Sequence, residues 1–344
     1  MPRDGVDPDR SSARVHAPGR VNLIGDHTDH TGGLVFPMAI DRGTTIRFEP
    51  GGDRIDLTSD AADGHAAIPL PFHDDPGSVE PSWARYVAAM AGELGATRGL
   101  RGNVTSDIPA GAGLSSSAAL ECATALALGF SGDPVDLALA AQRAEHAATG
   151  VPTGIMDQLC IAAARAGHAV LIDCHTLDLQ HVPIPDDLDV VVQFVAHRTL
   201  VGSAYTDRVA ECRRAEQVLG PLRSVDVDDL AADALTALDP VAARRARHVV
   251  TENARVTAFA AAIDSGDYAE AGRLMTESHR SLRDDFETST PAMDAAVEQA
   301  ASTPGVFGAR MTGGGFGGCI VAIAAAGSPV TGWKVRPSRG AHRC

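Results

Sequence analysis

Apolar and polar residues alternate along much of the first sixty positions, and a period of two is typical of β-strands with one buried face. Four segments show this alternation, namely 13–17 (ARVHA), 33–40 (GLVFPMAI), 43–50 (GTTIRFEP) and 54–60 (RIDLTSD). A helix is predicted at 82–96, and a further strand at 99–107 (GLRGNVTSD). The N-terminal part of the chain therefore predicts an antiparallel or mixed sheet.

The period lengthens to that of an α-helix after residue 114. Three helices are predicted at 115–129, 134–148 and about 155–165, followed by a strand hairpin within 168–184. A buried strand at 189–197 comes next, and then helices at 203–219, about 240–263, 267–283 and 291–302. In the second of these helices one face carries Val249, Val256, Phe259 and Ile263. The last predicted strand follows a glycine turn in ARMTGGGFGGCIVAIAA (309–325).

This mixture of strands and helices indicates an α+β protein, and 344 residues are enough for two domains. The pattern changes at PIPDD (183–187). We therefore place a boundary near residue 185, which gives domains at 1–185 and 186–344.

Composition argues against several classes of protein. The net charge of −15 is unfavourable for a nucleic-acid partner, because duplex binding needs clustered cationic side chains. Six cysteines without a CxxC pair are typical of free thiols in a reducing compartment. The polar N-terminus does not resemble a signal peptide, and no apolar run approaches the roughly 20 residues of a membrane span. We expect a cytoplasmic protein without a membrane or nucleic-acid partner.

Residues 109–119 (PAGAGLSSSAA) have the layout of a phosphate-binding loop. Gly111 and Gly113 allow the backbone to approach an anion, and Ser115 to Ser117 place N–H groups at the start of a predicted helix. The only lysine of the chain is Lys334, so this loop differs from GxxxxGK[ST], which uses a lysine. Taken alone, the segment favours a phosphate-binding loop over the alternative, an ordinary helix start with a serine cap and a flexible entry loop.

Three further segments carry candidate chemistry. GRVNLIGDHTDH (19–30) gathers an arginine, two carboxylates and two imidazoles, which suits a ligand with many hydroxyl groups or a simple polar turn. GVPTGIMDQL (150–159) places Asp157 at a helix start, where a carboxylate is either a cap or a catalytic group. GGGFGG (313–318) is either a second turn that approaches an anion or a structural connection between strands.

In this order along the chain, the four segments resemble those of the GHMP small-molecule kinases and, within them, the galactokinase family. GRVNLIGDHTDH looks like the sugar signature, PAGAGLSSSAA like the ATP loop, GIMDQ like the catalytic-aspartate segment and ARMTGGGFGG like the third motif. RARHVVTENARV (245–256) and VRPSRGA (335–341) are also similar to galactokinase segments. The resemblance covers about residues 14–344. It implies an N-terminal domain like domain 2 of ribosomal protein S5 and a ferredoxin-like α+β C-terminal domain.

The resemblance implies phosphoryl transfer from MgATP to the C1 hydroxyl of D-galactose, with galactose 1-phosphate and ADP as products. By matching motif positions, Asp157 would orient or deprotonate that hydroxyl, and Arg20 would keep Asp157 ionised and stabilise the transferring group. The implied sugar-binding residues are Asp26, His27, Asp29, Gly154 and Tyr205. The implied ATP-binding residues are Pro109, Gly111, Ala112, Gly113, Leu114, Ser115, Ser116, Ser117 and Trp83. Ser117 and Glu145 are the implied ligands of Mg²⁺.

Three features depart from the family's pattern. Asp26 stands where the signature usually has glutamate, and His30 where it has tyrosine. Another sugar-1-kinase, acting on N-acetylgalactosamine, arabinose or a uronic acid, is therefore an alternative. Only GSPVTG (327–332) stands where the family has a helix, so we expect a missing helix and a sheet that is exposed or covered by a partner.

The alternative from another class is a non-catalytic sugar and ATP sensor. Such a protein is expected to have a damaged phosphate loop or to lack the catalytic pair, whereas Arg20, Asp157 and the serine loop are intact here. The sequence therefore favours an enzyme, which we expect to be a monomer or a weak homo-oligomer.

Overall fold

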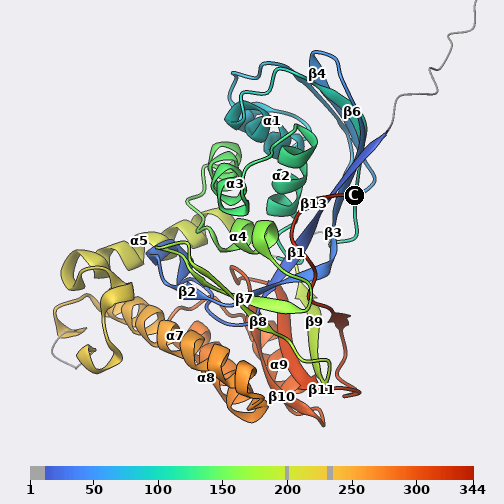
Figure 1. The fold of residues 1–344 in the computed structure, drawn as a ribbon. Helices are drawn as coiled ribbons and strands as arrows, with labels where there is room; N and C mark the ends of the chain where they lie inside the picture. The colour runs from blue at the N-terminus through green and yellow to red at the C-terminus, as the bar shows by residue number, and fades with distance from the viewer. Residues whose placement is uncertain (1–11, 110, 198–200, 231–234) are drawn as a thin grey trace, which may run out of the picture.

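The computed structural model describes residues 12–109, 111–197, 201–230 and 235–344. Within these ranges the chain forms three sheets with helices packed against them (Figure 1). None of the helices in the described ranges has the length and apolar character needed to cross a membrane.

The largest sheet has six strands in the order β13-β1-β3-β6-β4-β5. These strands are β1 (Ala13–Asn22), β3 (Pro37–Pro50), β4 (Arg54–Ser59), β5 (His65–Pro69), β6 (Leu100–Ser106) and β13 (His342–Arg343). All neighbours are antiparallel except β4 and β6, so the predicted mixed sheet is confirmed. The sequence pattern does not predict β5, because only Ala66 and Ile68 mark its buried face.

Four helices lie together on one side of this sheet (Figure 1). They are α1 (Ala84–Glu93), α2 (Ser116–Ala127), α3 (Pro134–Thr149) and α4 (Met156–Ala163). α2 is rich in alanine and almost entirely buried, so it packs closely between its neighbours. The N-terminal ends of α2 and α4 meet, because Ser115 donates a hydrogen bond to Asp157. Two helix N-termini, each with unpaired backbone N–H groups, therefore open toward the same place.

A small sheet of the first half is bound to the second half through Arg223. It contains β2 (Leu34–Val35), β7 (His168–Asp173) and β8 (Leu179–Pro183), and the β7–β8 pair confirms the predicted hairpin. Arg223, from the 3₁₀ turn η3 (Leu222–Ser224), donates two hydrogen bonds of 2.8 Å to the carboxylate of Asp173. These bonds lower the pKa of Asp173 to about 2. Arg223 also donates to the carbonyl of Gly32, so it ties the second half to the turn that follows the signature segment.

The second half contains an antiparallel sheet in the order β10-β11-β9-β12. Its strands are β9 (Leu188–Ala196), β10 (Val306–Thr312), β11 (Gly318–Ala325) and β12 (Trp333–Val335). Its helices are α5 (Val201–Leu219), α7 (Pro240–Ser265), α8 (Tyr268–Asp284) and α9 (Pro291–Ala301). The apolar face predicted for α7 is confirmed, since all four of its marker residues are buried.

Residues 326–332 contain no helix, as predicted. The expectation that this leaves the sheet exposed or covered by a partner is wrong. Along β11, Ile320 and Ala322 pack with residues of α9, whereas Val321 and Ile323 pack in the main core with residues of α8. β12 pairs with β9 and covers its edge. The chain itself therefore covers both faces of this sheet.

The domain boundary near residue 185 stays a prediction. One hydrophobic core contains residues of β1, β3 and α2 together with residues of β9, α7 and α8. The chain also returns to the first sheet at its far end, where Val15 of β1 pairs with Arg343 of β13. The two halves are thus joined by a shared core and by a shared sheet.

Candidate active site

A cavity of about 320 Å³ lies where the two halves meet, and the four motifs converge on it. Most of the predicted site residues line it, namely Arg20, Asp26, His27, Asp29, Gly111, Gly113, Ser115, Ser116, Ser117, Glu145, Gly154, Asp157 and Tyr205. Gly313 to Phe316, from the glycine turn, line it as well. The glycine turn therefore belongs to the site as well as to the strand connection.

Four predicted residues do not line this cavity. The side chains of Ala112 and Leu114 are buried beneath the loop, and the carbonyl of Pro109 accepts a hydrogen bond from Ala112. Trp83 donates its indole N–H to the carbonyl of Asp63, whereas Tyr86, one turn further along, lines the cavity. A direct contact of Trp83 with the nucleotide stays a prediction.

Arg20 and Asp157, which both line the cavity, form an ion pair. Nε and Nη2 of Arg20 both lie 2.7 Å from Oδ1 of Asp157, while Nη1 donates to the carbonyl of Gly113. Ser115 donates its hydroxyl to the other carboxylate oxygen. Burial acts to lower the pKa of Arg20, but the carboxylates of Asp157 and Asp26 raise it above its ordinary value. Both oxygens of Asp157 are thus held in place in the first turn of α4.

The serine loop does not form the serine cap that was the alternative explanation. Ser115 precedes α2 with φ +59° and makes no cap hydrogen bond, because its hydroxyl is turned to Asp157. Gly111 and Gly113 have φ of +71° and +76°, a region that glycine enters without strain. The first N–H groups of α2 therefore face the cavity with the positive end of the helix dipole.

Ser117 and Glu145 lie together, as the metal prediction requires. The hydroxyl of Ser117 donates to Glu145 Oε1 at 3.0 Å, and Gln158 donates to Oε2 at 2.7 Å. Burial raises the pKa of Glu145, and the charge of Asp157 raises it further. A carboxylate and a hydroxyl beside a phosphate loop suit Mg²⁺, which keeps waters and shares oxygens of the nucleotide. The described residues contain no cluster of three His, Cys, Asp or Glu side chains that would hold a metal on its own.

Polar groups of the signature and their neighbours also line the cavity. Burial and the nearby charge of Asp157 raise the pKa of Asp29 to about 7. A Cβ on Gly154 would lie 2.0 Å from the Asp29 carboxylate, so only glycine fits there. Burial raises the pKa of Tyr205 well above its ordinary value, which keeps its hydroxyl neutral. These groups can exchange hydrogen bonds with several hydroxyl groups of one small ligand.

Asp26 is bound more tightly by the protein than the sequence indicates. Its Oδ1 accepts a hydrogen bond from the backbone N–H of Gly313, and its Oδ2 lies 2.6 Å from Nη2 of Arg310. Arg310 is fully buried and also faces Glu252, whose pKa falls to about 2. Arg310 and Glu252 were missed by sequence reasoning, although each is a charge within a mostly apolar strand or helix face. A charged residue in a mostly apolar segment was the one signal in the sequence that could have found them.

His30, the other departure from the signature, stands between two cavities. Its ring lies edge-on to Tyr205, with centroids 6.1 Å apart. It also lines a second cavity of about 300 Å³, which shares Asp29 and Gly154 with the first. Burial lowers the pKa of His30 to about 4, so the ring is neutral at physiological pH.

Comparisons with known proteins agree with this geometry. The family models "GHMP kinases N terminal domain" and "GHMP kinases C terminal" match residues 83–165 and 259–329, and "Galactokinase galactose-binding signature" matches 7–50. A solved mevalonate kinase of Methanococcus jannaschii shares the fold, with a TM-score of 0.67 at 18% identity over 96% of this chain and 100% of that one. Fold and site together define a GHMP small-molecule kinase.

Closer relatives narrow the class. The chain is 46% identical to a galactokinase of Roseiflexus over 90% of this chain and 82% of the relative. It is 43% identical to the galactokinase of Homo sapiens over 90% of this chain and 83% of the relative. A solved Lactococcus lactis galactokinase complexed with galactose superposes with a TM-score of 0.90 at 30% identity, over 97% and 96% of the two chains. The chain belongs to the galactokinase family, a family of sugar kinases that use ATP as co-substrate.

Proposed function

We propose that this chain phosphorylates the C1 hydroxyl of D-galactose with MgATP, giving galactose 1-phosphate and ADP. The observation that carries the proposal is the Arg20–Asp157 pair, which stands between the serine loop and the polar signature residues. A sugar bound against Asp29 and Tyr205 and a nucleotide bound at the serine loop would meet at this pair.

Asp157 would orient the hydroxyl that attacks the phosphoryl group, or accept the proton of that hydroxyl. Its two oxygens are fixed by Arg20 and Ser115, so the carboxylate is oriented before substrate binds. A carboxylate held in this way is a suitable general base for a hydroxyl group. Arg20, buried and always charged, would stabilise the negative charge that spreads over the transferring group.

At the nucleotide end of the cavity, backbone N–H groups rather than a lysine side chain would bind the phosphates. The N–H groups at the start of α2 and the close backbone approach at Gly111 and Gly113 would hold phosphate oxygens. Ser117 and Glu145 would hold Mg²⁺, which when bound neutralises phosphate charge. Gln158 holds the second oxygen of Glu145 and so fixes the carboxylate toward the cavity.

A coupled ADP-release assay on galactose, with and without Mg²⁺, tests the activity. We expect Asp157→Asn to lower kcat by about a hundredfold or more while ATP binding persists. Asp136→Asn is a matched control, because Asp136 lies in the first turn of α3 but is exposed and away from the cavity. If Asp157→Asn keeps most of the wild-type rate, the catalytic assignment is wrong.

Other sugars should be tested in the same assay, because His30 lines a second cavity next to the first. N-acetylgalactosamine, arabinose and galacturonate would be compared with galactose by kcat/KM. If kcat/KM for one of these sugars is more than about tenfold higher than for galactose, that sugar is the substrate. The sensor alternative predicts no turnover with any sugar.

We further infer a cytoplasmic setting. Of the six cysteines, Cys122, Cys160, Cys174, Cys212 and Cys319 are buried and none forms a disulfide. Free buried thiols are typical of a reducing compartment. Fractionation of cells that express the chain, and its mass in solution, would test the location and the expected monomer or weak homo-oligomer.

A further inference from the structure

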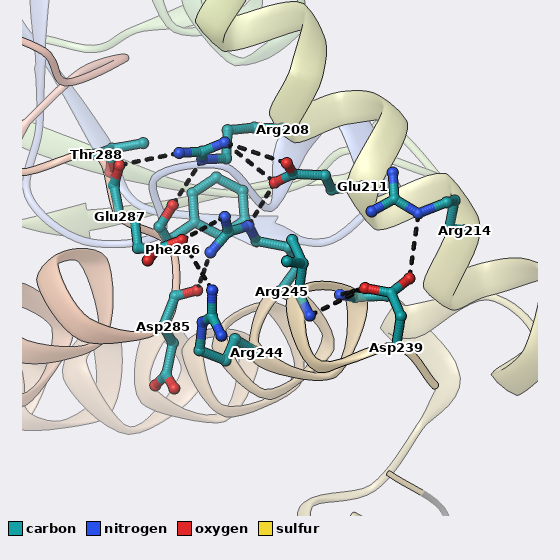
Figure 2. Close-up of polar contacts among 12 residues, drawn as sticks. Arg208, Glu211, Arg214, Asp239, Arg244, Arg245, Asp285, Phe286, Glu287 and Thr288 are labelled. Carbon is teal, nitrogen blue, oxygen red and sulfur yellow. Dashed lines mark hydrogen bonds and ion pairs between the residues drawn. The ribbon is translucent and has the colours of Figure 1, made fainter. Parts of the chain in front are cut away.

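Two arginines outside the cavity hold three consecutive carbonyl groups of one loop (Figure 2). Arg245 of α7 donates through Nη1 to the carbonyl of Asp285. Arg208 of α5 donates through Nε to the carbonyl of Phe286 at 2.8 Å and through Nη2 to that of Glu287 at 3.2 Å. The loop between α8 and α9 is therefore fixed by side chains of two other helices.

Two carboxylates balance the charge of these arginines. Glu211 Oε2 accepts from Arg245 at 2.6 Å and from Arg208 at 3.1 Å, and Glu287 Oε2 accepts from Arg245 at 2.6 Å. We call Arg208, Glu211, Arg245 and Glu287 the arginine cluster. Arg245 is only 1% exposed. Because a buried ion pair adds little net stability over apolar packing, a role in fixing one conformation is the better explanation for this cluster.

The loop needs such support, because its backbone is strained. Glu287 has φ +58°, a left-handed conformation that costs free energy for any residue with a Cβ. Such conformations persist where the surroundings hold them. Arg208 holds the carbonyl that precedes this residue, that of Phe286, and the carbonyl of Glu287 itself.

The loop in turn supports two walls of the cavity. The ring of Phe286 stacks on His27 with centroids 4.6 Å apart and an interplanar angle of 29°. The carbonyl of Thr288 accepts a hydrogen bond of 2.8 Å from the backbone N–H of Phe316. His27 and Phe316 both line the cavity, from the signature and from the glycine turn.

The same cluster also lies near Tyr205, a third residue that lines the cavity. Arg208 follows Tyr205 by one helical turn on α5, and its guanidinium lies 5.8 Å from the ring centroid of Phe316. We propose that the arginine cluster is a positioning device for the sugar end of the site. It fixes the loop so that His27 and Phe316 are oriented for the sugar, and it holds α5 one turn from Tyr205. This inference rests on the proposed function for the identity of the ligand.

Arg208→Lys is the central test, because lysine keeps the charge but cannot reach two carbonyls and Glu211 with one ammonium group. We expect the KM for galactose to rise about tenfold or more, since small misplacements of binding groups carry large kinetic costs. The KM for ATP should stay within about twofold, because none of the cluster's hydrogen bonds among the described residues involves the serine loop. Arg208→Met should show the same split more strongly.

Arg214→Lys is the matched control. Arg214 lies on the same helix and pairs with Asp239 at 3.3 Å, but both side chains are about half exposed and neither touches the loop (Figure 2). Its kinetic constants should equal those of the wild type. Equal rises in both KM values for Arg208→Lys, or an unchanged galactose KM, would overturn the proposal.

Hydrogen exchange on the free protein gives a readout that does not depend on activity. In Arg208→Lys we expect faster exchange in peptides covering 285–290 and 313–318, with peptides of α2 unchanged. Unchanged exchange in those two segments would overturn the proposal. If the wild type fails to phosphorylate galactose, the proposed function fails, whereas the exchange result still decides the role of the cluster.

Discussion

Gly154 lies against the carboxylate of Asp29, and replacing it with alanine tests the sugar end of the cavity. A Cβ at Gly154 would lie 2.0 Å from Asp29 Oδ2 and 2.2 Å from its Cγ, whereas ordinary contact begins at 3.4 Å. The backbone of Gly154 does not have a positive φ, so alanine introduces no backbone strain there. The perturbation is therefore the steric conflict with one carboxylate.

The size of the effect follows from that distance. Relief of the conflict needs a movement of about 1.4 Å, which is larger than the useful range of a hydrogen-bond length. Losing a hydrogen bond to a charged group costs about 1.5–3 kcal/mol, and about 1.4 kcal/mol is a factor of ten. We expect Gly154→Ala to raise the KM for galactose about tenfold to a hundredfold, with the KM for ATP within about twofold.

Steady-state kinetics with each substrate varied in turn measures the split. Gly92→Ala is the control, because a Cβ there meets only Phe72 at an ordinary 3.5 Å and Gly92 lies within α1. The double variant Gly154→Ala with Asp29→Gly lacks the three atoms that the new Cβ would meet. Its galactose KM should equal that of Asp29→Gly alone, since the two sites act through one contact.

Two results would refute the reasoning. A galactose KM within about twofold of the wild type would mean that Asp29 does not bind the sugar. Strictly additive effects in the double variant would mean that alanine acts through something other than Asp29.

Three other predictions concern charge. With its pKa near 7, Asp29 is partly protonated at neutral pH, so the affinity for galactose should fall as the pH drops from 8 to 6. Calorimetry in different buffers should detect the release of a proton when galactose binds. The Asp29→Asn variant should not release this proton. Burial acts to raise the pKa of Glu252, but Arg255 and Arg310 lower it to about 2, so its stability contribution is present above its unfolded pKa and lost as pH falls toward 2. Denaturant unfolding should show Glu252→Gln to be about 3 kcal/mol less stable than the wild type at pH 7. The free energy of unfolding of the variant should also fall less steeply as the pH is lowered, and an equally steep fall would contradict this explanation. Arg20→Lys cannot reach both Asp157 and Gly113, so kcat in the ADP-release assay should fall about a hundredfold, and a loss below threefold would contradict a transition-state role.

Local patterns predicted most of the fold. The alternation before residue 60 and the helical spacing in α7 mark faces that are in fact buried. The pairing of β1 with β13 could not be predicted, because two residues carry no periodicity and their partner lies at the other end of the chain. From the missing helix we expect a sheet that is exposed or covered by a partner, because the sequence does not show that β12 takes over the edge.

The motifs predicted the centre of the site but not its support. Arg20 and Asp157 stand in recognisable segments, and the structure brings them together. Arg310 and Arg245 are as buried as any core side chain, yet their roles depend on partners more than thirty positions away. Such long-range ion pairs leave no local pattern, apart from a charge where apolar spacing predicts none.

The pairing of Val15 with Arg343 also has a consequence for how the protein forms. During synthesis, β1 emerges early, but the strand that completes its outer side emerges only after the whole second half. An open strand edge is a site for pairing with other chains. The nascent first half is therefore the stage most exposed to aggregation, and removing residues 342–344 should lower the yield of folded protein before it affects catalysis.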